Sequence, residues 1–94
     1  MNWLFADPPN MAVISHRRIV ERENSISFVS HDEDDGGWQF LPNSDGALDA
    51  SEAVVASFKS IVDIDSSIVE LADLPLGWCA RRPSQTEQWI REKI

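Results

Sequence analysis

Four consecutive carboxylates followed by two glycines constrain this chain more than any other stretch. Residues 32–35 read Asp-Glu-Asp-Asp, and the glycine pair after them leads into Trp-Gln-Phe-Leu at residues 38–41. Four like charges in a row repel one another and suit a solvated loop. The segments on either side, residues 26–29 and 38–41, have the two-residue period of a strand. The stretch therefore predicts a β-hairpin with an acidic loop.

The predicted hairpin also places a candidate core. Ile26 and Phe28 share one face of the first arm, and Trp38 and Phe40 share one face of the second. Pairing the arms would set these aromatic and β-branched side chains beside one another, which is a stabilising combination across strands.

Local signals along the chain predict further short elements. Residues 1–10 form an extended lead-in whose aromatics dock on the domain or on another copy, and residues 11–14 form a strand. Ser15 then caps a helical turn over residues 16–21 with Ile19 and Val20 turned inward.

The second half alternates strands and helices. Residues 53–56 are a predicted strand, and Ser57 caps a short helix after them. Another helical turn starts near Asp65, with a capping box from Ser67 to Glu70 as a competing start, and residues 76–82 form the last strand. A capping box from Ser84 to Glu87 opens a C-terminal helix over residues 84–94.

These elements predict one domain over residues 1–94 of the α+β class. We expect an antiparallel sheet of about four to five short strands with short helices packed on one face. The length of 94 residues is enough to close a core without disulfides.

The net charge and the cysteine content limit the expected partners and the expected compartment. Sixteen acids against eight bases give a net charge of −8. Nucleic acid and anionic membranes select basic surfaces, so neither is an expected partner. The single cysteine, Cys79, fits a reducing cytoplasm, and we expect neither a signal peptide nor a transmembrane helix in the sequence.

The acidic loop is the best candidate site. Its carboxylates suit a basic protein surface, so the predicted partner-binding residues are Asp32, Glu33, Asp34, Asp35 and Trp38. An ordinary solvated loop is the bland alternative. A calcium site is a third reading, but aligning Gly37 with the glycine of an EF-hand puts Asn43 where a glutamate is required. No cofactor is predicted.

Catalysis has little support. His16 and His31 lie in different elements without metal-ligand spacing, so no zinc site is expected. His31 and Asp32 could form a base with its orienting acid, but no nucleophile motif accompanies them. A non-enzymatic binding protein is the leading hypothesis. The alternative is a small self-associating regulatory or structural module, such as a homodimer, suggested by the apolar lead-in and Trp89.

Three segments, residues 29–41, 53–65 and 71–81, resemble a bacterial family of unknown function later grouped as immunity family thirty-three of polymorphic toxin systems. The likeness covers about residues 12–82. It implies a small cytoplasmic protein that binds and blocks a cognate, basic toxin through an acidic surface. The residues at its motif positions are Asp34, Asp35, Gly37, Trp38, Phe40, Pro75, Gly77 and Trp78.

Overall fold

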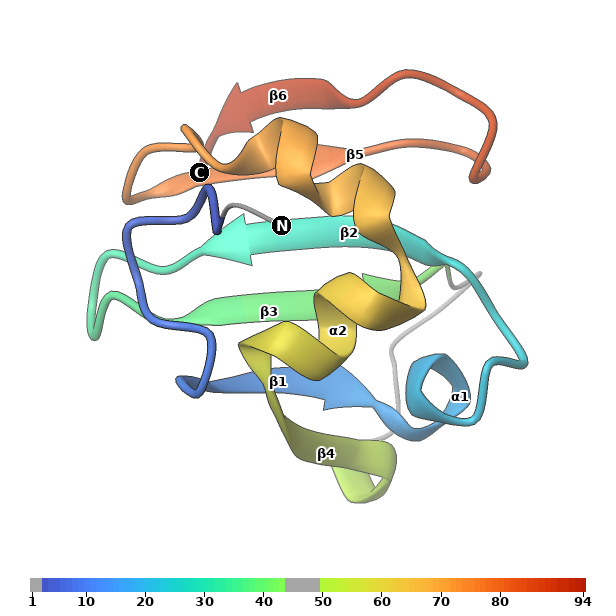
Figure 1. The fold of residues 1–94 in the computed structure, drawn as a ribbon. Coiled ribbons are helices and arrows are strands. Elements are labelled where there is room, and N and C mark those ends of the chain that lie inside the picture. Colours follow the sequence, from blue (N-terminus) through green and yellow to red (C-terminus); the bar gives the residue numbers. More distant parts are fainter. Residues whose placement is uncertain (1–2, 44–49) are drawn as a thin grey trace.

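A six-stranded mixed sheet forms the centre of the computed structural model, which describes residues 3–43 and 50–94 (Figure 1). Its strands run in the order β4-β1-β3-β2-β5-β6. The strands are β1 (Ala12–His16), β2 (Ile26–His31), β3 (Trp38–Pro42), β4 (Ala53–Ser57), β5 (Trp78–Arg81) and β6 (Ile90–Lys93). The helical elements are α1 (Arg17–Val20), α2 (Phe58–Ile64) and the 3-10 turns η1 (Ala50–Glu52) and η2 (Ser66–Leu71).

The α+β class is confirmed, but the predicted sheet was wrong in two respects. It has six strands rather than four to five, and β1 pairs with β3 in parallel while the other neighbours are antiparallel. Parallel neighbours need a long connection. Here the chain between β1 and β3 contains α1 and β2, so β1 enters the sheet beyond the hairpin.

The predicted hairpin of β2 and β3 is present, with a different register. The pairing shifts between Ile26 and Phe28, which marks a β-bulge. After the bulge Val29 pairs with Phe40, while Phe28 pairs with Leu41. The expectation that Phe28 would join the core beside Trp38 is therefore wrong, because the extra residue turns Phe28 to the opposite face.

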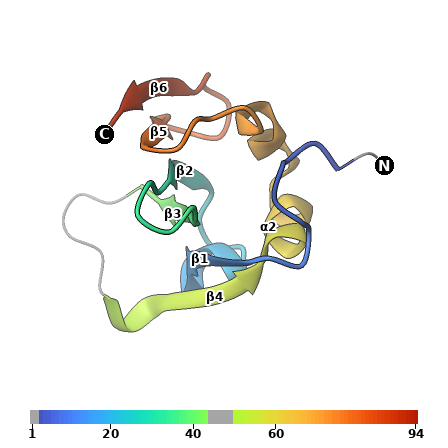
Figure 2. The ribbon, with the colours of Figure 1, turned by 90° about the vertical axis from the view of Figure 1, so that its left-hand side faces the viewer.

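One face of the sheet carries the core. In Figures 1 and 2, α2, η2 and the lead-in all cover this same side. Phe5 from the lead-in is 5% exposed and lies 4.3 Å from the ring of Phe58 in α2 and 5.4 Å from that of Trp38. The lead-in aromatics thus dock on their own domain, where aromatic contacts stabilise this segment.

Helix caps show where local signals were right. Ser57 caps α2 by accepting a hydrogen bond from the amide of Ser60, as predicted, and Asp65 caps η2. The cap of α1 is His16 rather than Ser15. Ser15 instead lies in β1, where its hydroxyl donates to the carbonyl of Phe40. Val20 is 42% exposed, so its predicted inward position is wrong.

The predicted C-terminal helix over residues 84–94 is wrong. The chain turns at residues 84–87 and returns as β6, which pairs with β5 in antiparallel register. Trp89 lies with its ring 4.0 Å from the guanidinium of Arg82, and that group donates to Asp65 at 2.7 Å. The stacking of Trp89 on this buried cation holds the start of the returning chain beside the domain.

Among residues 3–43 and 50–94, no helix is both long and apolar enough to cross a membrane.

Candidate functional site

The acidic loop joins β2 to β3 as a tight turn. The amide of Asp32 donates to the carbonyl of Gly37 at 2.7 Å, and the amide of Gly36 donates back to the carbonyl of Asp32 at 2.9 Å. Gly36 has φ of 72°, a conformation that favours glycine. Asp35 accepts from the amide of Gly37 at 2.8 Å. The turn is therefore ordered by its own backbone, and the side chain of Asp35 is held by it.

The four carboxylates differ in their surroundings. Asp32 is partly buried and accepts from the side-chain amide of Gln39 at 2.8 Å. Glu33, Asp34 and Asp35 are exposed. None of the four forms an ion pair with an arginine or lysine among the described residues. The charges of Glu33, Asp34 and Asp35 therefore face water without a direct ion pair to a described arginine or lysine.

A hollow of about 500 Å³ lies beside the loop. Its wall includes all four loop acids, Gln39 of β3, Gly77 before β5 and Lys93 of β6. Gly77 has φ of 81°, and a Cβ there would lie 3.1 Å from an oxygen of Glu33. A glycine at this position thus lets the chain turn and leaves room for Glu33 at the rim.

Trp38 lies under the loop rather than on its surface. Its side chain is 3% exposed, and its indole nitrogen donates to Asp7 at 3.0 Å. This burial leaves the ring almost no exposed surface in the free protein, and the role of Trp38 in partner binding stays a prediction. Its ring packs between Phe5 and His31 and supports the first residue of β3 from the core side.

His31 does not pair with Asp32. Its Nδ1 donates to the carbonyl of Leu74 at 2.7 Å, and its ring stacks on Trp38 with centroids 4.0 Å apart. The nearest acid to its Nε2 is Asp7, at 4.0 Å. The base and orienting acid considered for catalysis are therefore not assembled, because their side chains leave the strand on opposite faces.

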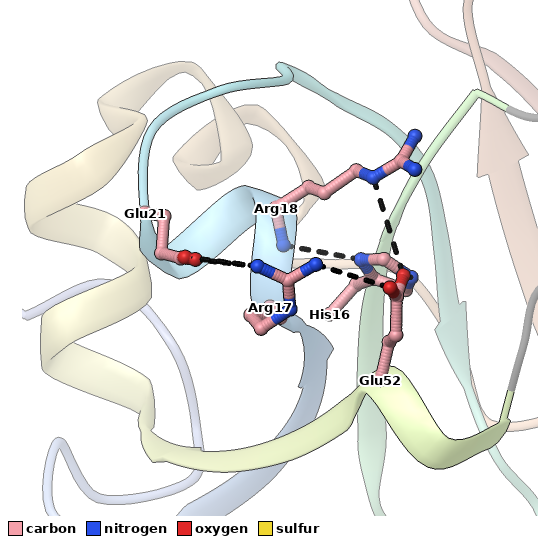
Figure 3. Close-up of polar contacts among 5 residues, drawn as sticks. All are labelled: His16, Arg17, Arg18, Glu21 and Glu52. Atoms are coloured by element: carbon pink, nitrogen blue, oxygen red, sulfur yellow. Dashed lines mark hydrogen bonds and ion pairs between the residues drawn. The ribbon is translucent and has the colours of Figure 1, made fainter.

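A second polar cluster was missed at the sequence level, at the opposite end of the strands (Figure 3). The amide of Arg18 donates to Nδ1 of His16 at 3.1 Å, so the proton of the neutral ring is on Nε2, which lies 3.1 Å from Glu52. Glu52 also accepts from Arg17 at 3.1 Å, and Arg17 contacts Glu21 at 2.8 Å. His16 and Glu52 are far apart in sequence, and no local motif signals their contact.

The charged groups of this cluster stabilise one another in their ionised forms. The hydrogen bond and charge of Arg17 hold the pKa of Glu52 below its ordinary value, and Glu52 and Glu21 raise the pKa of Arg17. These contacts connect α1 to η1, the turn that leads into β4. We interpret the cluster as a clamp that fixes the start of β4.

Within the part of the chain that the structure describes, no group of three or more histidine, cysteine, aspartate or glutamate side chains could hold a metal ion. The calcium reading of the loop gains no support from this geometry.

Comparison with known families places the chain. The model of the family described as "Immunity protein Imm33 domain" matches residues 13–93. The match covers both the acidic hairpin and the strand pair β5–β6. The chain therefore belongs to this immunity protein family, in agreement with the resemblance seen in the sequence.

Membership of an immunity protein family indicates, in general terms, a protein that neutralises a toxin and has a protein partner. No curated protein and no solved structure matches the chain.

Proposed function

We propose that this protein is a non-enzymatic, cytoplasmic immunity protein that neutralises a toxin by setting its acidic loop, residues 32–35, against a basic surface of that toxin. Family membership supports the general role. The observation that carries the finer proposal is the row of carboxylates that lines the hollow. Three of them, Glu33, Asp34 and Asp35, are exposed, and none of the four forms an ion pair with a described arginine or lysine.

The contrast with other acids of the chain strengthens this inference. Glu52, Asp65 and Asp73 each pair with an arginine. Among the described residues the four loop acids have no such ion pair, although Asp32 and Asp35 accept hydrogen bonds from Gln39 and Gly37. Like charges held together cost stability unless a cation offsets them, and a partner's lysine or arginine side chains would supply that cation. Such complementarity raises the association rate and selects the partner.

The proposal includes a reducing, cytoplasmic location and a mode of action without catalysis. Cys79 is a free, buried thiol in β5, which suits a cytoplasmic protein. Among the described residues, His16 and His31 contact backbone groups and acidic side chains that hold neighbouring elements together. The toxin would then be blocked by occupancy of its surface rather than by chemistry on it.

The test starts by capturing the toxin from the native cells on the tagged protein at low salt, with identification by mass spectrometry. The affinity of the purified pair is then measured against salt concentration. In the variant Asp32→Asn, Asp34→Asn, Asp35→Asn, the amides can still accept the bonds from Gln39 and Gly37. We expect its affinity to fall about tenfold or more and its salt dependence to flatten.

A matched control removes the same charge elsewhere. The variant Glu23→Gln, Glu70→Gln, Glu87→Gln alters three exposed acids outside the loop. We expect it to keep most of the affinity. Equal losses in the two variants would show that net charge alone matters, and an unchanged affinity of the loop variant would reject the role of the loop.

A further inference from the structure

The two edges of the sheet differ in how they are protected. β6 reads Ile-Arg-Glu-Lys, and charged side chains on an edge strand discourage pairing with another chain. β4 reads Ala-Val-Val-Ala-Ser and has no charge and no proline. In Figures 1 and 2, β4 is the outermost strand of the sheet, and no described element lies beyond it. This edge therefore lacks the charged side chains and the proline that commonly prevent strand addition.

The register shows which backbone groups of β4 are available. The amide of Phe58 donates to the carbonyl of Met11 at 2.8 Å, which continues the ladder between β4 and β1. Antiparallel ladders alternate, so Val54 and Ala56 direct their backbone groups at β1. Val55, in the middle of the strand, directs its N–H and C=O outward.

Apolar side chains accompany this open backbone. Val55 is 69% exposed, and its partner on β1, Ile14, is 39% exposed on the same face. A strand added beside β4 would satisfy the outward backbone groups and cover part of this apolar row.

Charge complementarity favours a second copy as the occupant. The chain carries −8 overall, so most faces of two copies repel. Among the described residues around β4, three bases and three acids pair with one another and cancel. These residues are Arg17, Arg18, Lys59, Glu21, Glu52 and Asp63. Glu52 lies just before β4 and Lys59 lies just after it. Antiparallel pairing of two β4 strands would therefore bring Glu52 of one copy near Lys59 of the other.

From these observations we propose that β4 is a self-association surface. Two copies pair their β4 strands antiparallel about a two-fold axis at Val55, which joins the two sheets into one. Val55 then faces Val55 of the second copy as a hydrogen-bonded pair, and Ala53 faces Ser57. The acidic loops stay outside this contact, since they lie at the ends of β2 and β3 (Figure 1).

Sedimentation of the free, full-length protein over a range of concentrations tests the surface. We expect a monomer–dimer equilibrium, weakened about tenfold or more by Val55→Lys, which puts a charge in the middle of the edge. The matched control, Ile90→Lys, adds the same charge to β6, where Ile90 is 62% exposed, and should leave the equilibrium unchanged. A protein that is monomeric at millimolar concentration, or equal effects of the two substitutions, would overturn the proposal.

Oxidative cross-linking tests the register. A hydrogen-bonded antiparallel pair places its Cα atoms about 5.5 Å apart, within disulfide reach. Val55→Cys should therefore form a cross-linked dimer under mild oxidation. Ala53→Cys lies on the same exposed face but about 13 Å from its own copy, at four residues of strand rise, and should not cross-link. Circular dichroism confirms that each variant folds. Cross-linking of both variants, or of neither, would refute the two-fold pairing.

Discussion

At the scale of single residues, Arg82 connects more of the structure than any other side chain described above. Its side chain is 1% exposed and meets that of Asp65, which is 6% exposed, at 2.7 Å. It also donates to the carbonyl of Ile26 and the hydroxyl of Ser67. A buried guanidinium needs these partners, because an unpaired buried charge is costly. One residue therefore holds β2, η2 and the turn before β6 together.

Replacing Asp65 by a neutral residue should show how strongly the fold depends on the buried ion pair with Arg82. Asp65→Asn can still accept the bond from the amide of Ser67, but it leaves the charge of Arg82 buried and unpaired. We expect a loss of about 3–5 kcal/mol in the free energy of unfolding, measured by urea denaturation. The matched control is Glu92→Gln, which breaks the exposed pair with Arg81 and should cost about 1 kcal/mol or less. Similar losses would show that burial does not matter here.

The contact between Glu52 and Arg17 should make a pH-dependent contribution to stability. Because Arg17 lowers the pKa of Glu52 in the folded protein, the ionised carboxylate stabilises the fold above its ordinary pKa. That contribution disappears as the pH falls through the lowered value. We expect wild type to exceed Glu52→Gln in unfolding free energy at neutral pH, with a gap that narrows as the pH falls below the ordinary glutamate pKa of about 4.3. In an Arg17→Met background the gap should be small at every pH. A gap that persists there would assign the effect to another group.

At the scale of elements, β6 is the segment whose conformation most depends on tertiary contacts. The amide of Ile94 donates to the carbonyl of Gly77 at 2.8 Å, and the alternation of the ladder then points the amide of Glu92 at β5. The amides of Arg91 and Lys93 point away from the sheet. The side chain of Arg91 meets Asp73 at 2.8 Å, which adds a contact to the turn after η2.

Hydrogen exchange should reproduce this alternation. We expect the amides of Glu92 and Ile94 to exchange roughly tenfold or more slowly than those of Arg91 and Lys93, followed by NMR. Glu87→Ala should leave stability within about 0.5 kcal/mol, because no helix start depends on Glu87. Protection of consecutive amides over residues 88–94 would instead indicate a helix.

The elements that the sequence predicted well are those with local causes. The caps at Ser57 and Asp65, the strand at β4 and the hairpin of β2 and β3 each follow from residues within a few positions. The capping box at Ser84 was also a local signal, and there tertiary pairing with β5 prevailed over it. The bulge between Ile26 and Phe28 replaced Phe28 in the core by Val29, which the two-residue period could not reveal.

At the scale of the whole molecule, charge is distributed unevenly over the described residues. The free acids of the loop lie at one end of β2 and β3, and the paired charges around His16 and Glu52 lie at the other (Figures 1 and 3). The composition predicted an acidic binding protein, and the acidic loop was located from sequence. The paired cluster was not, because its acid and its bases meet only through the long connection between β1 and β4.

This separation makes the two proposals compatible. A basic toxin at the acidic loop would leave the β4 edge uncovered, and a second copy at β4 would leave both loops accessible. Each proposal can fail without the other, because self-association is measured on the free protein and loop binding is measured against the toxin.

The position of β1 inside the sheet has a consequence for how the chain acquires its structure. β1 is the first strand made, but both of its neighbours, β3 and β4, come later in the sequence. Its pairs join residues as distant as His16 with Ala53 and Ala12 with Ser57. Such contacts require a large loop to close first, and proteins rich in them fold slowly. During synthesis β1 has no partner strand until β3 has been made, and its second neighbour, β4, is complete only when Ser57 has been added.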